Sequence, residues 1–369
     1  MLQPTYRMPS LPPRAEFETP SILKAAALAH RHLAELKGRA ISVPNPEILI
    51  DTLTLQEARA SCEIENIVTT QDDLYRAAVF PDSPWNPAVK EVTSYRSAVK
   101  LGFHQLQEND HRLTNDLLID IYRIVKSRTD GYRVRPGTVI SNTFTGEIVH
   151  VPPQDPAEVL EKMDELTSFA NDDSLSGLDP LVKMAVIHHQ FESIHPFEDG
   201  NGRVGRILNV LYLVRCGLLE IPILYLSGAI TRSKPQYYRL LRAVQHEDAW
   251  EDWVTYILKA VAETSRDTLQ LVENIRSLMA EYKDAIRNKL PRLYSHELLN
   301  ALFRHPYTRI AAMQRDVQVS RPTAARYLRL LTAEGLLSKR RAGRADYYVN
   351  TRLVELFREE DDPRGTSPA

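Results

Sequence analysis

The twelve residues 195–206 contain an unusual concentration of groups that can act on phosphates. They read His-Pro-Phe-Glu-Asp-Gly-Asn-Gly-Arg-Val-Gly-Arg. A histidine titrates near neutrality and can take a proton from a hydroxyl, and an aspartate can hold a divalent cation. The Gly-Asn-Gly turn lets successive backbone N–H groups point at an anion. The two arginines are three residues apart, share a helix face and can each bind a phosphate. Together these groups predict a site that holds a nucleoside triphosphate and its metal while a base prepares a hydroxyl for attack.

A helix is expected directly after the turn. The apolar residues at positions 204, 207, 208, 211 and 212 have helical spacing. The turn would therefore lie at a helix N-terminus, where unpaired N–H groups and the helix dipole favour phosphate. The alternative is an ordinary anion-binding helix start with a histidine nearby.

The same residues resemble the signature of the Fic (filamentation induced by cyclic AMP) family, His-x-Phe-x-Asp/Glu-Gly-Asn-Gly-Arg-x-x-Arg, at every defined position. Enzymes of this family mostly transfer AMP from ATP to a hydroxyl of a protein. The resemblance implies that His195 is the general base for a target Ser, Thr or Tyr. It also implies that Asp199 holds Mg²⁺ on the phosphates and that Phe197 anchors the loop in the core.

The resemblance also assigns the phosphate contacts. The backbone N–H groups of Gly200, Asn201 and Gly202 would form the anion hole for the α- and β-phosphates. Arg203 would contact those phosphates, and Arg206 would reach the γ-phosphate. Catalysis would come mainly from positioning and charge stabilisation.

A second motif lies upstream, where residues 61–66 read Ser-Cys-Glu-Ile-Glu-Asn. With Ser61, Glu65 and Asn66 at the defined positions, it resembles the family's inhibitory motif, Ser/Thr-x-x-x-Glu-Gly/Asn. A helix is expected over residues 53–68, which lack Gly and Pro and have apolar residues at roughly helical spacing. The resemblance implies that Glu65 pairs with Arg206 at the γ-phosphate position, so that ATP binds unproductively. Taken alone, Glu65 would be interpreted as a solvated surface carboxylate.

A β-hairpin is predicted within residues 134–153. β-Branched residues bounded by Gly, Asn and Pro indicate two short strands around a turn at 141–146. In the Fic family, a hairpin flap beside the active site receives the target segment as an added strand. The resemblance places the flap, and the docking of a target protein, at residues 138–151, with 140–149 as its body. The alternative is a structural hairpin that covers the helical core.

Segments after the signature resemble those that form the adenine and ribose side of the family's site. Of these, Tyr225, Leu226 and Tyr238 are expected to neighbour the nucleotide, although aromatic residues at helical spacing are more often core. His188 and His189 precede the signature on a predicted helix and are interpreted as structural, because no His-x-x-His or carboxylate cluster indicates a zinc site.

The composition excludes several classes of protein. The chain has 369 residues, of which 43% are hydrophobic, and this predicts two or three domains with a sizeable core. Cys62 and Cys216 imply no disulfide framework and fit a reducing cytoplasm. The most apolar run, residues 207–230, contains charged residues and a proline, so we expect no membrane span. The Pro-rich N-terminus lacks the apolar segment of a signal peptide, and a cytoplasmic location is expected.

The charge is uneven along the chain. The net charge is −2, but residues 295–350 contain ten basic and four acidic residues. Their pattern predicts a winged helix-turn-helix, with helices near 298–303, 310–316 and 321–334 and two strands over 336–349. Basic residues that suit phosphate contacts with DNA lie on its third helix and wing: Arg321, Arg326, Arg329, Lys339, Arg340 and Arg341. The alternative is a winged helix that contacts protein or mediates dimerisation, with these residues simply solvated.

These elements predict a mainly α protein, with a Fic-type helical core, a small β-hairpin flap and a C-terminal winged helix-turn-helix domain. The expected parts are an N-terminal helical region with the inhibitory helix (1–88), the Fic core (89–246), connecting helices (247–290), the winged helix (291–358) and a disordered tail (359–369). The leading hypothesis is an autoinhibited protein adenylyltransferase that uses ATP and Mg²⁺, acts on a target protein or on itself, and forms a homodimer.

Two alternatives from other classes of function stay open. One is a different activity on the same site, either removal of AMP with Glu65 activating water or transfer of another nucleotide. The other is a DNA-binding transcriptional regulator whose Fic core senses ATP.

Overall fold

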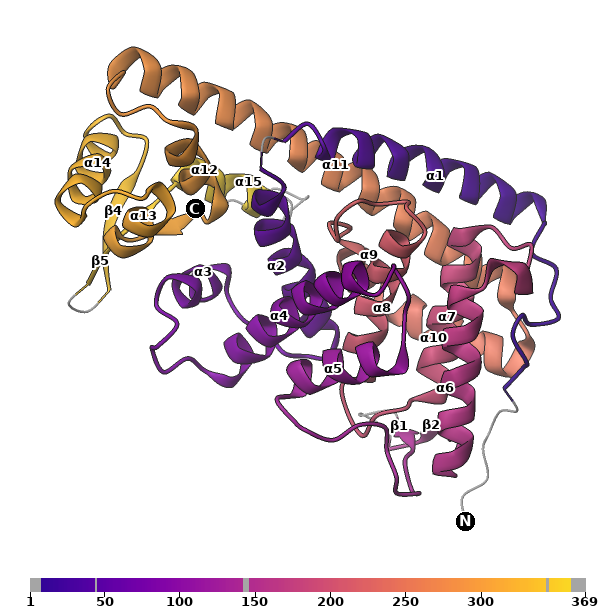
Figure 1. Ribbon diagram of the computed structural model, residues 1–369. Coiled ribbons are helices and arrows are strands. Elements are labelled where there is room, and N and C mark those ends of the chain that lie inside the picture. The colour runs from indigo at the N-terminus through magenta and orange to yellow at the C-terminus, as the bar shows by residue number, and fades with distance from the viewer. Residues whose placement is uncertain (1–7, 44, 142–145, 343–344, 360–369) are drawn as a thin grey trace. The chain divides into compact units, whose positions relative to one another are not determined.

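The computed structural model describes residues 8–43, 45–141, 146–342 and 345–359. Within these residues the protein is mainly α-helical, with two small antiparallel sheets, as the sequence predicts (Figure 1). The predicted hairpin turn at 142–145, the wing residues 343–344 and the tail 360–369 lie outside the described residues. In the described part of the chain, no helix is long and apolar enough to cross a membrane.

The helices and strands follow one another in this order: α1 (Pro20–Ala40), α2 (Pro46–Ile64), α3 (Gln71–Val79), α4 (Pro87–Glu108), α5 (Asn115–Lys126), β1 (Ile140–Ser141), β2 (Ile148–His150), α6 (Pro156–Asn171), a short 3₁₀ turn (Asp173–Leu175), α7 (Pro180–Ile194), α8 (Asn201–Arg215), α9 (Leu226–Arg232), α10 (Lys234–Glu247), α11 (Trp250–Lys289), α12 (His296–Arg304), β3 (Tyr307–Thr308), α13 (Ile310–Val317), α14 (Arg321–Ala333), β4 (Ser338–Ala342), β5 (Ala345–Val349) and α15 (Thr351–Glu359).

The chain folds into two compact units, and neither is one continuous segment. The first unit comprises Met1–Lys37, Thr54–Val68 and Lys90–Arg266, and the second comprises Gly38–Leu53, Thr69–Val89 and Asp267–Ala369. Helices α1, α2, α4 and α11 therefore contribute residues to both units.

Helices α7 and α8 form the centre of the first unit (Figure 1). The sequence of α7 is apolar around most of its circumference, which is typical of a helix buried on all sides, and every residue from Leu181 to Ile194 is buried. The two helices pack against each other, α5 packs against α8, and α6 packs against α7. The loop that joins α7 to α8 contains the signature histidine, so two buried helices that pack against each other position this loop.

The predicted hairpin is present. Strands β1 and β2 pair antiparallel, with Ile140 opposite His150. The buried ring of His150 places Nε2 2.9 Å from the carbonyl oxygen of Ser193, near the end of α7. This hydrogen bond attaches the second strand of the hairpin to Ser193, which precedes His195 by two residues in the chain.

The structure corrects the limits of the helix expected over residues 53–68. Helix α2 begins at Pro46 and ends at Ile64, so Glu65 and Asn66 lie in the turn after it. The helix ends because Asn66 adopts a left-handed conformation, with φ of 60°, while the N–H of Ile67 donates to the carbonyl of Cys62. Glu65 therefore sits on a sharply turning backbone, not on a continuing helix face.

In the second unit, helices α12, α13 and α14 are followed by the β4–β5 hairpin, and β3 completes a sheet with the order β3-β5-β4. Helix α14 begins after Ser320, whose hydroxyl accepts the N–H of Thr323, and has Pro322 in its first turn. It ends before Gly335, which has a φ of 73° that a residue with a side chain rarely adopts.

Residues 38–53 join this second unit through a buried carboxylate. Asp51 is 2% exposed and accepts a hydrogen bond from Nε of Arg304 at 3.0 Å. A buried charge is stable only with such a partner, so this pair fixes the first half of α2 to the unit that contains α12.

Candidate active site

His195 ends helix α7 in a left-handed conformation, with φ of 50° and ψ of 58°. A residue other than glycine is strained there and stays only where its surroundings hold it. The buried Arg133 provides this support, since its Nε donates to the carbonyl of His195 at 2.9 Å and its N–H donates to the carbonyl of Pro196 at 2.9 Å. Its guanidinium also donates to the carbonyl of Pro153. Arg133 was not identified from the sequence, because it lies 62 residues before the histidine.

The loop after His195 is closed by a side chain. The amide of Asn201 accepts the N–H of Phe197 and donates to its carbonyl, both at 2.8 Å. Phe197 is fully buried and stacks on Tyr122, with ring centroids 4.1 Å apart. Asn201 thus does more than contribute a backbone N–H, because its side chain sets the shape of the loop.

The His195 imidazole is neutral over a wide pH range. Burial lowers its pKa to about 4, and the neighbouring His150 and Arg133 act in the same direction. A neutral imidazole has a free lone pair and can accept a proton, which is the first requirement for a general base.

Helix α8 begins at a tight approach between backbone and side chains. Gly200, which precedes it, has a φ of 83°. A Cβ added at Gly202 would lie 2.5 Å from Oε1 of Glu65 and 2.9 Å from Nη1 of Arg206. A side chain at this position would require Glu65 or Arg206 to move, so the N-terminus of the helix lies directly against the residues that follow α2.

Arg206 is joined to the segment at the end of α2 by three hydrogen bonds. Its guanidinium is 1% exposed; Nε donates to the Ser61 hydroxyl at 2.8 Å, and Nη2 donates to the Ser61 carbonyl at 2.9 Å and to Oε1 of Glu65 at 2.8 Å. Although burial alone would lower the pKa of Arg206, the charge of Glu65 raises it. Asn66, the third residue of the motif, accepts a hydrogen bond from Lys234 at 2.9 Å. The structure therefore brings together the upstream motif and the second signature arginine.

The other two charged residues of the signature have partners that the sequence analysis missed. The Arg203 guanidinium is 3% exposed and donates to Glu91 of α4. Asp199 Oδ2 lies 2.6 Å from Nζ of Lys126, the last residue of α5. Although partial burial would raise the pKa of the Asp199 carboxyl, the Lys126 ammonium lowers it below its usual value.

Two further buried carboxylates lie close to Arg206. Glu57 lies in α2, four residues before Ser61. Its carboxylate accepts hydrogen bonds from the N–H of Ser227 at 2.9 Å, from the Ser227 hydroxyl, and from the Tyr95 hydroxyl at 3.2 Å. Burial raises the pKa of Glu57. Burial likewise raises the pKa of Glu192 to about 7, with Arg206 lowering it and Glu65 raising it. No local sequence pattern distinguishes these glutamates from solvated ones.

The residues expected beside the adenine of ATP differ in their burial. Leu226 is buried in the core at the start of α9, while the Tyr238 side chain remains 36% exposed. Burial and the charge of Glu65 both raise the pKa of Tyr238, so its hydroxyl lies within electrostatic reach of the Glu65 carboxylate. His188 and His189 are fully buried, with burial lowering both pKa values to about 3, in agreement with a structural interpretation.

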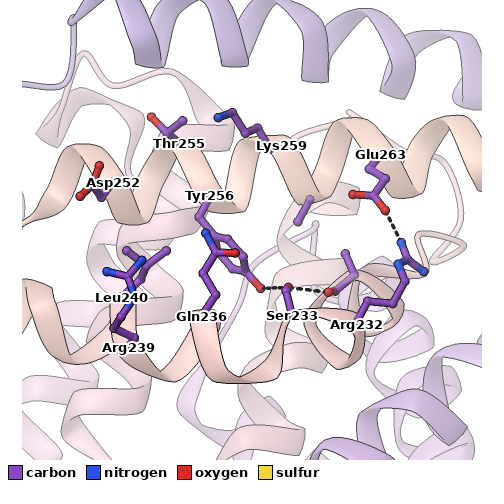
Figure 2. A pocket seen from close by; sticks show the side chains of 12 residues that line it. Arg232, Ser233, Gln236, Arg239, Leu240, Asp252, Thr255, Tyr256, Lys259 and Glu263 are labelled. Atoms are coloured by element: carbon purple, nitrogen blue, oxygen red, sulfur yellow. Dashed lines mark hydrogen bonds and ion pairs between the residues drawn. The ribbon is translucent and has the colours of Figure 1, made fainter.

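A separate groove lies between α9, α10 and α11 (Figure 2). It has a volume of about 360 Å³. Gln236 and Arg239 of α10 line it, and helical geometry directs their side chains to a different face of α10 from that of Tyr238. Arg232 pairs with Glu263 at 2.5 Å across one end. The lining includes none of the signature residues, so the groove is distinct from the candidate active site.

The predicted DNA-contacting residues are all exposed. Three lie on α14 and three on β4: Arg321, Arg326, Arg329, Lys339, Arg340 and Arg341. Lys339 pairs with Asp346 of the neighbouring strand at 2.7 Å. The remaining five are also exposed, on α14 and β4.

Three family models match successive parts of the chain. The Fic/DOC family N-terminal model matches residues 23–104, the Fic/DOC family model matches 112–213, and the model of the protein adenylyltransferase SoFic-like C-terminal domain matches 278–353. Together they contain every residue of the signature and of the upstream motif.

Curated relatives carry the name protein adenylyltransferase. Protein adenylyltransferase fic-1 of Caenorhabditis briggsae is 28% identical over 173 residues, which are 46% of this chain and 31% of the relative. A probable protein adenylyltransferase of Aquifex aeolicus (strain VF5) is 27% identical over 201 residues, 54% of this chain and 57% of the relative. The chain thus spans about a third of the length of the first relative and somewhat over half of the second.

Solved structures share the fold. A Fic family protein from Desulfovibrio desulfuricans G20 matches with a TM-score of 0.53 and 19% identity, covering 94% of this chain and 98% of that one. A fragment of Fic-1 from Caenorhabditis elegans matches with a TM-score of 0.54 and 20% identity, covering 70% of this chain and 75% of that one.

Proposed function

The chain belongs to the Fic/DOC family, and on this premise we propose that it is an autoinhibited protein adenylyltransferase. The observation that carries the proposal is the ion pair of 2.8 Å between Glu65 and Arg206, formed beside a complete signature with a half-buried, neutral base. A site that only bound nucleotide would need neither the base nor the competing carboxylate.

The proposed reaction moves an AMP group onto a hydroxyl. His195 takes the proton of a target Ser, Thr or Tyr, and the oxygen forms a bond to the α-phosphorus of ATP. The bond from that phosphorus to the oxygen of the β-phosphate breaks, and pyrophosphate leaves. The N–H groups at the start of α8 and the signature arginines stabilise the charge that develops on the phosphates.

The residues at the start of α8 fit Mg²⁺. This cation takes one or two carboxylates together with phosphate oxygens and waters. The side chain of Asp199 is 62% exposed and offers one such carboxylate next to the helix N-terminus. We propose Asp199 as the protein ligand, and the bound ion would neutralise charge on the phosphates.

Autoinhibition follows from the contacts of Arg206. Its Nε and Nη2 are occupied by Ser61 and Glu65, so the guanidinium cannot reach a γ-phosphate while Glu65 stays in place. Because the guanidinium is buried, the carboxylate also supplies its counter-charge. ATP that enters would meet a negative group at the γ-position and bind in an unproductive pose.

The test of the reaction uses ATP labelled separately at the α- and γ-phosphates. We expect the Glu65→Gly protein to retain the α-label and not the γ-label, with an intact-mass increase of one AMP and release of pyrophosphate in equal amount. Retention of γ-label would show phosphate transfer and contradict the proposal. No label on protein despite ATP binding would favour a target that is absent from the assay, removal of AMP, or nucleotide sensing.

The pH profile provides a prediction about the base. Because the His195 pKa is about 4 in the free protein, kcat/KM of the Glu65→Gly variant should be flat above about pH 5.5 and fall only near pH 4. The lowered pKa leaves the base unprotonated throughout that range. Circular dichroism at each pH would control for unfolding. A half-maximal kcat/KM near pH 6.5, the value of an exposed histidine, would contradict the assignment.

Target docking is proposed at the hairpin. Strands β1 and β2 form a two-stranded sheet, a kind of element that an added strand can extend, and the His150–Ser193 contact holds β2 against the end of α7, next to His195. We propose that a target segment, or a segment of the protein itself in a homodimer, binds there.

DNA binding is the second candidate function, favoured by the row of exposed arginines on α14. We expect a salt-dependent affinity for duplex DNA, and replacing Arg326 and Arg329 by Ala should flatten the slope of log K against log salt by about 2. Arg31→Ala, in an exposed position of α1, is the matched control. An unchanged slope in the double variant, or no binding at low salt, would leave this module as a protein-contact domain.

A further inference from the structure

Lys126 lies across the start of helix α8. Its side chain is 14% exposed, and Nζ lies 2.6 Å from Oδ2 of Asp199 and 3.7 Å from Oε1 of Glu91. Its Cδ lies 3.0 Å from the position that a Cβ at Gly200 would occupy. The ammonium group is therefore held beside the proposed anion hole by two carboxylates.

The backbone fixes where this lysine starts. Lys126 is the last residue of α5, and Ser127 ends the helix with a φ of 51° and an N–H that donates to the last turn. Helix α5 packs against α8. The lysine stem is thus anchored, and only its terminal atoms can change partner.

Four charges form a compact cluster: Lys126, Arg203, Glu91 and Asp199. The two positive and two negative charges balance while no ligand is bound. If Asp199 becomes a metal ligand, the ammonium loses its nearest acceptor and meets a divalent cation beside it. Only a group with added negative charge restores the balance, and the nucleotide supplies it.

The coordination geometry of Mg²⁺ would place a negatively charged phosphate oxygen within reach of the Lys126 ammonium group. Neighbouring oxygens in the octahedral shell of Mg²⁺ lie about 3 Å apart, since each is about 2.1 Å from the ion. A phosphate oxygen that shares the ion with Asp199 would therefore lie close to the carboxylate oxygen that Lys126 now contacts. An ammonium on a flexible stem can move between two such oxygens without backbone change.

We propose that Lys126 is a phosphate-binding residue of this site. When a metal ion binds the Asp199 carboxylate, the Lys126 ammonium group moves from that carboxylate to the β-phosphate of the nucleotide. The inference rests on the proposed function and extends it: the site has a third cation besides Arg203 and Arg206. In the free protein the same lysine competes with Mg²⁺ for Asp199. On the leaving pyrophosphate, it stabilises the charge that develops as the bond to the α-phosphorus breaks.

The test measures binding by calorimetry in the Glu65→Gly background, with EDTA and then with Mg²⁺. With Mg²⁺ present, Lys126→Met should lower the affinity for ADP about ten- to hundredfold, the usual effect of losing a hydrogen bond to a charged group, and leave the affinity for adenosine unchanged. In EDTA the loss should be smaller, because Asp199 then keeps the ammonium group. Without nucleotide, the same variant should bind Mg²⁺ more tightly, because Asp199 is freed.

The controls separate a phosphate contact from a structural role. Lys126→Arg should retain most of the ADP affinity, and Lys24→Met, at an exposed position of α1, should behave as the parent. Thermal unfolding monitors the fold of each variant. Equal ADP affinity in Lys126→Met and the parent would overturn the proposal, as would an equal loss of adenosine affinity. If ADP binding depends on Lys126 but no variant transfers AMP, the proposed function fails and this inference survives.

Discussion

Replacing His195 by Ala in the Glu65→Gly protein is expected to lower the rate of AMP transfer about 10²- to 10⁴-fold, the usual contribution of a general base. The imidazole is half-buried and neutral, and Arg133 holds the residue in a strained backbone conformation that fixes the position of the base. The rate is measured as α-labelled AMP bound to protein at saturating ATP and Mg²⁺.

Measuring the affinity for ATP separates a role of His195 in proton transfer from a role in nucleotide binding. The phosphates are expected at the N-terminus of α8, so ATP affinity should change less than about threefold in the double variant. His104→Ala, whose side chain is 71% exposed on α4, is the matched control and should transfer AMP at the parent rate. A double variant that keeps the parent rate would remove His195 from the mechanism.

The sequence predicted the parts of the site that depend on neighbours along the chain. Residues 195–206 form a loop and a helix start whose shape follows from Gly200, from the side chain of Asn201 and from the apolar spacing after it. The helix that contains Arg321, Arg326 and Arg329 was predicted at 321–334 and is observed at Arg321–Ala333, because Ser320, Pro322 and Gly335 mark its ends locally.

The parts that escaped prediction depend on contacts between distant segments. Glu91 and Lys126 are separated from Asp199 and Arg203 by more than 70 residues, and nothing in their own surroundings marks them. Exposed glutamates and lysines are common, and only their contacts with the start of α8 in the folded chain distinguish these two. Glu57 is similar, since its partner Ser227 lies 170 residues away.

The end of α2 shows a second reason why prediction from the sequence fell short, namely that apolar periodicity does not mark where a helix ends. Apolar residues continue at helical spacing as far as Ile67, so periodicity alone extends the helix past Glu65. The left-handed conformation of Asn66 ends it earlier and is stabilised by the hydrogen bond from Lys234, a residue of α10. This turn aims Glu65 at Arg206, so the feature that periodicity missed is the one on which inhibition would depend.

Replacing Glu65 by Gly is expected to raise AMP transfer about 10- to 100-fold over wild type. The change removes a hydrogen bond between two charged groups, and such bonds contribute about 1.5–3 kcal/mol. Arg206 keeps its two bonds to Ser61, so it remains near the γ-position and becomes free to bind phosphate. Loss of the counter-charge should also lower the melting temperature without nucleotide and enlarge the stabilisation by ATP, because the γ-phosphate then replaces the carboxylate.

Two matched variants test whether the charge of Glu65 is the cause. Glu65→Gln keeps the size and loses the charge, so it should be activated nearly as much as Glu65→Gly. Glu63→Gln removes a carboxylate two residues earlier, in the last turn of α2, and should leave transfer unchanged. If Glu65→Gly is no more active than wild type while it binds ATP, this glutamate does not inhibit the protein, and the Arg206 contact is structural. Activation of Glu65→Gly alone, with Glu65→Gln still inhibited, would instead assign the inhibition to the bulk of the side chain at Gly202 and not to its charge.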